Sequence, residues 1–361
     1  MTAPVLRVLV LAATPARRQA MQAALETDAR LLVLAGAADA PQAIELAARR
    51  QADVIVVGQG GGPADAAAWV RSIMQARPTP VVVVSGSAAA DHDRQAFALM
   101  EAGALAVLRD PAAESGPAQK QALAALLESV RLMAEVKMVR RWVRAAADGP
   151  AAVPPAVAAH PLPLPAVATS ARGSRIELVA IGASTGGPVA LKQLLCALPA
   201  DFPVPIVIVQ HMADGFLPGL VDWLTVSCAI RTEIGVRHTL LQPGRAYLAP
   251  DGMHMRVTPE RQLALVEGPP LNGHRPSVGC LFASVAEHLG RHAIGILLTG
   301  MGRDGAVELK LLKDAGGITI AQDEASSVVH GMPGEAIRRG GASYVMSPEE
   351  IAAALPGLVQ R

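Results

Sequence analysis

Short apolar runs that alternate with helical segments constrain this chain more than any other feature of its sequence. Runs such as "ADVIVVG" and "PVVVVSG" are rich in valine and carry no polar face, as expected of buried strands. The segment "ARRQAMQAALE", which lies between two such runs, instead repeats apolar residues at helical spacing. Strands that are apolar on both faces and separated by helices are typical of parallel sheets covered on both sides. Residues 1–135 are therefore predicted to form one doubly wound α/β domain.

The alternation stops and then resumes further along the chain. Residues 136–172 are predicted to hold a helical extension and then a linker, since proline and alanine dominate and periodicity is lost after about residue 145. In residues 173–361, strands such as "IELVAIGAS" again alternate with helices such as "PVALKQLLCAL". A second doubly wound parallel-sheet domain is expected here, and "GRAYLAPDGMHMRVTPERQLALVEG" is expected to form an antiparallel insertion in it.

Composition excludes several classes of function. The chain has 361 residues, a formal net charge of +1 and only 2% aromatic residues. Neither a nucleic-acid partner nor a membrane surface is expected, because both need a basic excess. The three cysteines are far apart in the sequence, so free buried thiols and a cytoplasmic location are predicted. No membrane insertion is expected, since no apolar run approaches the length of a membrane span.

The stretch "IGASTGGPVAL" places glycines around a Ser-Thr pair where a strand turns into a helix. Two kinds of site are built this way, a phosphate cradle and a G-x-S-x-G nucleophile elbow. A P-loop needs a lysine before its Ser/Thr, and a dinucleotide fingerprint needs glycine where Ser184 stands. The next strand also ends in Gln210-His211 instead of an acidic residue. These tests favour the elbow.

Three strand ends of the second domain carry the residue types needed for acyl transfer. Ser184, His211 and Asp304 each follow a predicted strand, and the carboxyl ends of parallel strands meet at one edge of the sheet. A serine can attack a carbonyl carbon while a histidine takes its proton and a carboxylate orients that histidine. Taken one at a time, a turn serine, a structural histidine and a helix-capping aspartate remain the commoner readings. Their joint placement favours a hydrolase.

The motifs "IGASTGGPVAL", "IVIVQHM" and "GILLTGMGRDGAVELKLLKDAGGITIAQDEASSVVHGMPGEAI" closely resemble chemotaxis protein-glutamate methylesterases, the CheB family. The resemblance covers almost the whole second domain. It implies hydrolysis of γ-glutamyl methyl esters on chemoreceptor cytoplasmic helices with release of methanol, and deamidation of receptor glutamines. It assigns the nucleophile to Ser184, the general base to His211 and the orienting acid to Asp304.

The resemblance also assigns the oxyanion and substrate positions to Thr185, Gly186 and Met301. No metal and no organic cofactor is needed for this chemistry. One departure is Gly279 in "RPSVG", where the family usually has aspartate. That departure puts a local interaction in doubt and leaves the three proposed catalytic residues untouched.

The first domain resembles a response-regulator receiver, which implies a flavodoxin-like strand order. A working receiver needs an acidic pair after its first strand, an acceptor aspartate after its third and a lysine after its fifth. Here the acidic pair is replaced by Ala12 and Ala13, the acceptor by Gly58 and the lysine by Asp110. The serine or threonine that a receiver needs after its fourth strand is kept as Ser85. A pseudo-receiver that neither binds Mg²⁺ nor accepts phosphate is predicted.

The expected partner is a methylated chemoreceptor, together with other sensory-array proteins. In the family the receiver covers the esterase cleft until it is phosphorylated, so this resemblance implies activity that does not respond to phosphate donors. Two other classes stay open at this point. One is an interaction protein that works through its degenerate receiver and linker, and the other is a phosphate-binding module. A monomer is the default expectation, because nothing in the sequence signals oligomerisation.

Overall fold

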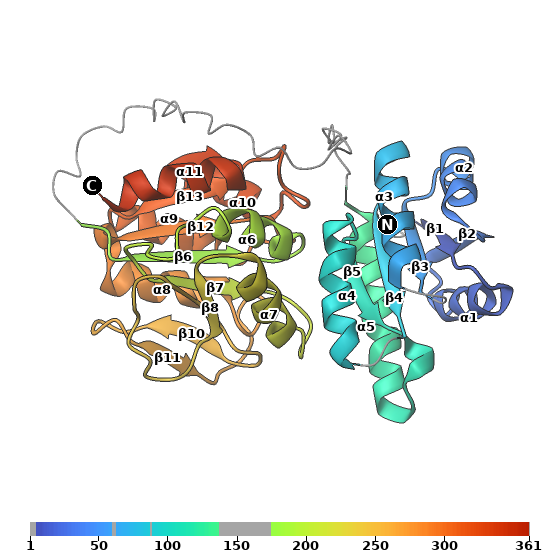
Figure 1. Cartoon of the computed structure of the whole chain (residues 1–361), viewed down its shortest axis with the longest axis horizontal. Helices are drawn as coiled ribbons and strands as arrows, with labels where there is room; N and C mark the ends of the chain where they lie inside the picture. The colour runs from blue at the N-terminus through green and yellow to red at the C-terminus, as the bar shows by residue number, and fades with distance from the viewer. Residues whose placement is uncertain (1–4, 60–62, 87–88, 137–174, 361) are drawn as a thin grey trace.

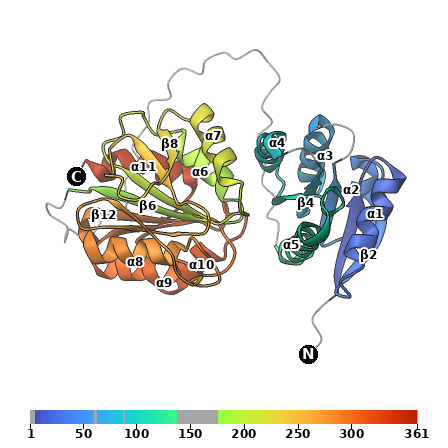
Figure 2. The same ribbon diagram turned by 90° about the horizontal axis from the view of Figure 1, so that it is seen from below.

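Two parallel β-sheets, each covered by helices on both faces, make up the computed structural model of the chain (Figures 1 and 2). The structure describes residues 5–59, 63–86, 89–136 and 175–360. This architecture confirms the predicted fold class of two doubly wound α/β domains. The predicted linker lies outside the described residues apart from Val136, so the proposed domain boundaries stay predictions.

The first domain has the flavodoxin-like strand order β2-β1-β3-β4-β5, and all of its strand pairs are parallel. Its strands are β1 (Leu6–Leu11), β2 (Leu31–Ala37), β3 (Val54–Gly58), β4 (Val81–Ser85) and β5 (Ala106–Arg109). Its helices are α1 (Pro15–Leu25), α2 (Ala40–Arg50), α3 (Pro63–Ala76), α4 (Ala89–Glu101) and α5 (Gly116–Ala134). A helical extension is predicted from residue 136 onward, but α5 ends at Ala134, and residues 137–172 are not among those described.

Alternate residues of the same strands feed two separate cores in this domain. In β3, for example, Ile55 and Val57 pack with α2, α3 and α4, whereas Val54 and Val56 pack with α1 and α5. Because successive side chains of a strand point to opposite faces, a strand between two helical layers must be apolar at every position. This requirement explains the continuous valine runs in the sequence.

The second domain is built on a seven-stranded parallel sheet in the order β14-β13-β12-β6-β7-β9-β8. Its strands are β6 (Leu178–Ala183), β7 (Ile206–Gln210), β8 (Arg231–Ile234), β9 (Arg245–Leu248), β12 (Ala293–Leu297), β13 (Ile318–Gln322) and β14 (Tyr344–Met346). Its helices are α6 (Gly187–Leu195), α7 (Leu217–Ser227), α8 (Val278–His288), α9 (Ala306–Asp314), α10 (Met332–Arg338) and α11 (Pro348–Val359). Helices α6, α7 and α11 cover one face, and α8, α9 and α10 cover the other.

The expected antiparallel insertion is only partly present. Strands β10 (His254–Val257) and β11 (Leu263–Val266) form an antiparallel pair, as predicted. Strand β9 was assigned to the same insertion, but it pairs in parallel with β7 and β8 and so belongs to the main sheet. All three strands are short and followed by turns, so local pattern alone did not distinguish an insertion strand from a sheet strand.

The two domains meet through α4 of the first and α6 and α7 of the second (Figures 1 and 2). The ring of Phe97 on α4 stacks on Trp223 of α7 with centroids 5.1 Å apart and an interplanar angle of 18°. Glu101 on α4 pairs with the ammonium of Lys192 on α6, which lies 4.7 Å from the centre of the Trp223 ring. These four side chains are called the docking contact below.

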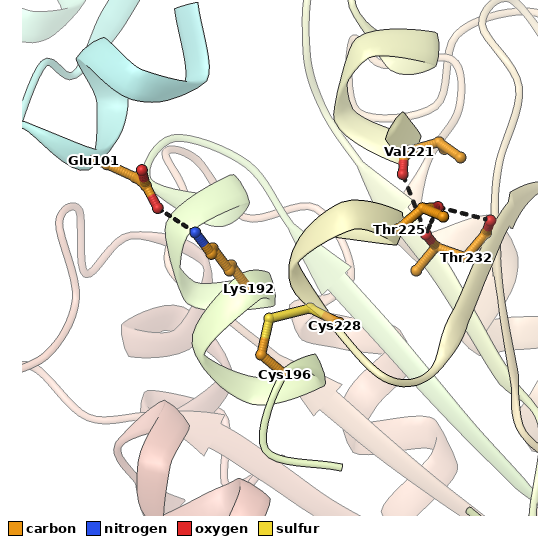
Figure 3. Close-up of a disulfide and its surroundings, with 7 residues drawn as sticks. All are labelled: Glu101, Lys192, Cys196, Val221, Thr225, Cys228 and Thr232. Atoms are coloured by element: carbon orange, nitrogen blue, oxygen red, sulfur yellow. Dashed lines mark hydrogen bonds and ion pairs between the residues drawn. A yellow bond between two sulfur atoms is a disulfide. The ribbon is translucent and has the colours of Figure 1, made fainter. Parts of the chain in front are cut away.

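The prediction of three free thiols is wrong for two of them. Cys196 and Cys228 form a disulfide across 32 residues of sequence, while Cys280 is unpaired (Figure 3). The pair follows from the fold, because Cys196 caps the end of α6 and Cys228 caps the end of α7. The sequence spacing of the two cysteines does not predict that these helix ends lie side by side.

Among the described residues, no helix is both long and apolar enough to cross a bilayer.

Candidate active site

Ser184 lies immediately after β6, between that strand and α6. Its amide donates to the carbonyl of Thr299 (3.0 Å), and its carbonyl accepts from the amide of Gly187 at the start of α6 (2.8 Å). Gly186 caps the helix with a φ of 79°, and a Cβ there would come within 2.5 Å of the Cβ of Val328. Only glycine satisfies both the left-handed backbone and the close approach. The turn therefore fixes Ser184 at the carboxyl edge of the central strand.

His211 follows the neighbouring strand, β7, and reaches the same edge. Its amide donates to the carbonyl of Ala183 (2.9 Å), which fixes its backbone beside that of Ser184. Gln210 strengthens the link, because its Nε2 donates to the carbonyls of both Ser184 (2.8 Å) and His211 (2.7 Å). Gln210 is buried and was not predicted as a site residue. Its position next to His211 at the strand end was the available signal.

Ser184, Thr185, Gly186 and His211 line one pocket, which the first domain covers from the other side. The covering residues come from α4, from β5 and the residue before it, and from α5, and they are mainly apolar: Met100, Leu105, Ala106, Val107, Leu108, Ser129, Leu132 and Met133. Met301, expected at the oxyanion site, lies in the loop after β12 and does not belong to this pocket lining. The structure thus places the predicted serine and histidine in the lining of one pocket beneath the first domain, but no hydrogen bond joins Ser184 Oγ to the His211 ring among the described residues.

Asp304 lies behind His211, in the turn before α9, and its side chain is 1% exposed. One of its oxygens, Oδ2, is 3.0 Å from Nε2 of His211 and accepts from the amide of Val278 (2.7 Å). The other, Oδ1, accepts from Asn272 Nδ2 (3.0 Å), Ser277 Oγ (2.8 Å) and the Gly279 amide (3.1 Å).

These contacts decide the charge of Asp304. Burial acts to raise the pKa of this carboxyl, but the contact with His211 and the hydrogen bonds from Asn272 and Ser277 outweigh it and lower the pKa to about 2. Asp304 is therefore a carboxylate at neutral pH. With Nε2 of His211 facing that carboxylate, Nδ1 is the other ring nitrogen, and it is buried without a hydrogen-bond partner among the described residues.

A second imidazole lies against the first. The ring of His274 stacks on the ring of His211 with centroids 3.9 Å apart and an interplanar angle of 10°. Burial and the nearby His211 lower the pKa of His274, although the charge of Asp304 acts in the opposite direction. Its lowered pKa favours the neutral form of His274, which contacts His211 through its stacked ring. Sequence reasoning missed this residue, because the loop 268–277 shows no regular pattern.

The departure at Gly279 has a visible counterpart on α9. A Cβ at position 279 would lie 2.9 Å from the carboxyl carbon of Glu308 and 3.1 Å from Oδ1 of Asp304. The carboxyl of Glu308 therefore fills the space that a side chain at 279 would need. Burial and the charge of Asp304 raise the pKa of Glu308, so two negative charges side by side are disfavoured here.

Among the described residues, no group of three or more His, Cys, Asp or Glu is arranged to hold a metal.

The low pKa of Asp304 predicts a stability that depends on pH. A carboxyl whose pKa falls from 3.8 to about 2 on folding contributes stability above pH 3.8 and loses it as the pH falls toward 2. Asp304→Asn is expected to lower the free energy of unfolding by about 2 kcal/mol at pH 6. The deficit should shrink toward pH 2 in urea unfolding. The exposed Asp201→Asn is the control, and a deficit that stays constant with pH would contradict the prediction.

The contact between Gly279 and Glu308 predicts strong coupling between the two positions. Gly279→Asp should destabilise the protein by about 1–3 kcal/mol, because the new carboxyl overlaps that of Glu308. Adding Glu308→Ala frees the space, so the double variant should recover most of the loss. A double-mutant cycle of unfolding free energies measures the coupling. Additive effects within about 0.5 kcal/mol would show that the two positions do not share one space.

Comparison with known proteins identifies the chain. The family model described as CheB methylesterase matches residues 179–355. Protein-glutamate methylesterase/protein-glutamine glutaminase 4 of Geobacter metallireducens is 42% identical over 98% of this chain and 98% of its own length. The corresponding protein 1 of Syntrophus aciditrophicus is 42% identical over 97% of each chain.

A solved structure agrees with these relatives. The CheB methylesterase catalytic domain of Thermotoga maritima is 35% identical, with a TM-score of 0.50, and the match covers 51% of this chain and 99% of that chain. The resemblance drawn from the sequence motifs is thereby confirmed. Because its relatives align over nearly its whole length at this identity, the chain belongs to the CheB methylesterase family.

Proposed function

We propose that this protein hydrolyses γ-glutamyl methyl esters on a chemoreceptor and releases methanol, with Ser184, His211 and Asp304 as its catalytic residues. The observation that carries the proposal is the junction of Asp304 and His211, a buried carboxylate 3.0 Å from an imidazole that shares a pocket with Ser184. The names of the relatives support the same activity. The interaction-protein alternative has no comparable support from the site.

The proposed reaction is acyl transfer in two steps. Ser184 Oγ attacks the ester carbonyl carbon while Nδ1 of His211 takes the hydroxyl proton, and Asp304 stabilises the resulting imidazolium. Backbone N–H groups at Thr185 and Gly186, which line the pocket just before α6, stabilise the oxyanion. The family resemblance adds Met301 to them, although Met301 lies outside the lining of that pocket. The proton on His211 then passes to the leaving methoxide, which departs as methanol. Water repeats the sequence on the acyl-serine and regenerates the enzyme.

The same steps accept an amide in place of an ester. Attack on a glutamine side chain would release ammonia, and water would resolve the same γ-glutamyl acyl-serine to a glutamate. The names of the relatives include protein-glutamine glutaminase, which supports this second substrate. Neither reaction requires a metal or an organic cofactor. The expected partners are methylated cytoplasmic helices of a chemoreceptor and other sensory-array proteins, which places the proposed site of action in the cytoplasm.

We further propose that the first domain is a pseudo-receiver without phosphorylation. A Cβ at Gly58, the acceptor position, would lie 2.2 Å from Sδ of Met21, so the flexible Met21 side chain takes up part of the space that an aspartate would use. Asp110 stands where a receiver needs lysine, and its carboxylate pairs with Arg17. A carboxylate at that position would repel a phosphoryl group, whereas the receiver chemistry needs a cation there.

The proposed mechanism predicts the effect of removing the nucleophile. Ser184→Ala should lower methanol release from a methylated chemoreceptor by several orders of magnitude, because the acyl-enzyme cannot form. Ser72→Ala, an exposed serine on α3, is the matched control and should leave the rate unchanged. Release of methanol by Ser184→Ala at the normal rate would refute the mechanism.

The proposed loss of phosphorylation has its own test. Incubation with acetyl phosphate and Mg²⁺ should leave the intact mass of the protein unchanged, because the acceptor, the acidic pair and the lysine are all replaced. The rate of ester hydrolysis should be the same with and without the phosphate donor. A mass increase corresponding to one phosphoryl group would contradict the prediction.

A further inference from the structure

We propose that the Cys196–Cys228 disulfide is a reversible thiol–disulfide modification site, and that its reduction by a dithiol loosens the docking of the pseudo-receiver on the catalytic domain (Figure 3). The inferred effect on docking stands on the contacts of the cysteines alone. The expected effect on hydrolysis rests, in addition, on the proposed function.

Each cysteine ends a helix that carries part of the docking contact. The amide of Cys196 donates to the carbonyl of Lys192 one turn earlier on α6 (2.9 Å). The amide of Cys228 donates to the carbonyl of Leu224 on α7 (2.8 Å), the residue after Trp223. The disulfide therefore joins the final turns of the two helices whose side chains meet α4.

Those side chains form one continuous contact with the pseudo-receiver. Lys192 pairs with Glu101 of α4 and also lies over the ring of Trp223, which stacks on Phe97 of α4. Figure 3 shows Glu101 and Lys192 pointing toward each other close to the disulfide. Because Lys192 and Trp223 contact one another as well as α4, the spacing of α6 and α7 decides whether both can contact α4 at once.

A covalent bond between the helix ends fixes that spacing. When the bond is broken, the ends of α6 and α7 are held together by non-covalent packing alone, and a cross-link that spanned 32 residues is lost. Helix α7 also continues the segment of Met212 and Phe216, which lines the covered pocket and packs into the core of the first domain. Movement of α7 thus acts on the cover of the proposed active site.

The site is open to exchange chemistry. Both cysteines are half-buried, and neighbours such as Ala197 and Val226 are exposed. A thiolate of the dithiol attacks one cysteine sulfur, the S–S bond breaks, and the other cysteine leaves as a thiolate that takes a proton. The second thiol of the reductant then displaces the remaining cysteine. Two electrons pass to the protein, two thiols form on it, and the reductant becomes a cyclic disulfide.

A redox-sensitive bond would give this chain a means of control that does not depend on phosphorylation of the first domain. A disulfide in a reducing compartment is usually catalytic or regulatory, because structural disulfides do not persist there. The positions through which a receiver is normally switched are replaced in this chain at Ala12, Ala13, Gly58 and Asp110. A redox-sensitive bond beneath the docking contact acts on the same interface without phosphoryl chemistry.

The test uses the full chain, oxidised with glutathione disulfide or reduced with dithiothreitol. Titration under denaturing conditions should find one thiol before reduction and three after it. Amide hydrogen exchange in α4 (residues 95–101) and in α7 should accelerate by about tenfold on reduction, because these elements lose contact with each other. Methyl ester hydrolysis should rise several-fold at the same time.

Matched variants separate this inference from simpler explanations. Cys196→Ser and Cys228→Ser should show the reduced behaviour with and without dithiothreitol, whereas Cys280→Ser should keep the full response. Glu101→Gln should accelerate exchange in α7 even in the oxidised protein, since it breaks the ion pair while leaving the disulfide intact. Equal exchange in the oxidised and reduced proteins would overturn the inference. Absence of hydrolysis in both states would count against the proposed function instead, since the exchange measurement does not depend on it.

Discussion

The buried carboxylate of Asp304 organises the functional edge of the catalytic domain. An ionised carboxylate removed from water is strongly unfavourable unless donors surround it, and here those donors come from the start of α8 and from the loop before it. The same carboxylate lies 3.0 Å from the imidazole at the end of β7. The contacts that stabilise this one carboxylate therefore bring the loop before α8, the start of α8 and the end of β7 next to the turn that holds Asp304.

The sequence alone predicts the framework of this edge but not its supports. Ser184, His211 and Asp304 could be identified because each follows a strand of a parallel sheet, and such strand ends converge by geometry. Asn272 and His274 could not be, since they belong to an irregular loop whose path is set by tertiary contacts with Asp304 and His211. The same limit applies to β9, whose partners are set by the sheet around it.

Pairs of distant residues show the same limit more sharply. The sequence alone shows Gly279 only as a glycine where the family resemblance implies aspartate. The structure adds that the carboxyl of Glu308 from α9 occupies the adjoining space. Cys196 and Cys228 likewise gain their meaning from the ends of two helices that meet. In both cases the informative quantity is a distance in space between residues far apart in the sequence, which a linear pattern does not contain.

The first domain illustrates how separable a fold is from its chemistry. Its two hydrophobic layers hold the sheet between helices α1 to α5 whatever residues stand at the strand ends, so the scaffold is compatible with the proposed loss of the acidic pair and the acceptor. Met21 and Arg17 then fill the vacated space. The domain also presents a surface, formed by α4, β5 and α5, that covers the pocket of Ser184.

Helix α6 connects the turn that holds Ser184 to the docking contact between the two domains. It has nine residues and is therefore about 13 Å long, with Ser184 just before its first turn and Lys192 and Cys196 at its last. A helix this short bends very little, so a tilt of its last turn also tilts its first turn. Ser184 and the docking contact consequently lie at the two ends of one helix, and neither can be repositioned without moving the other.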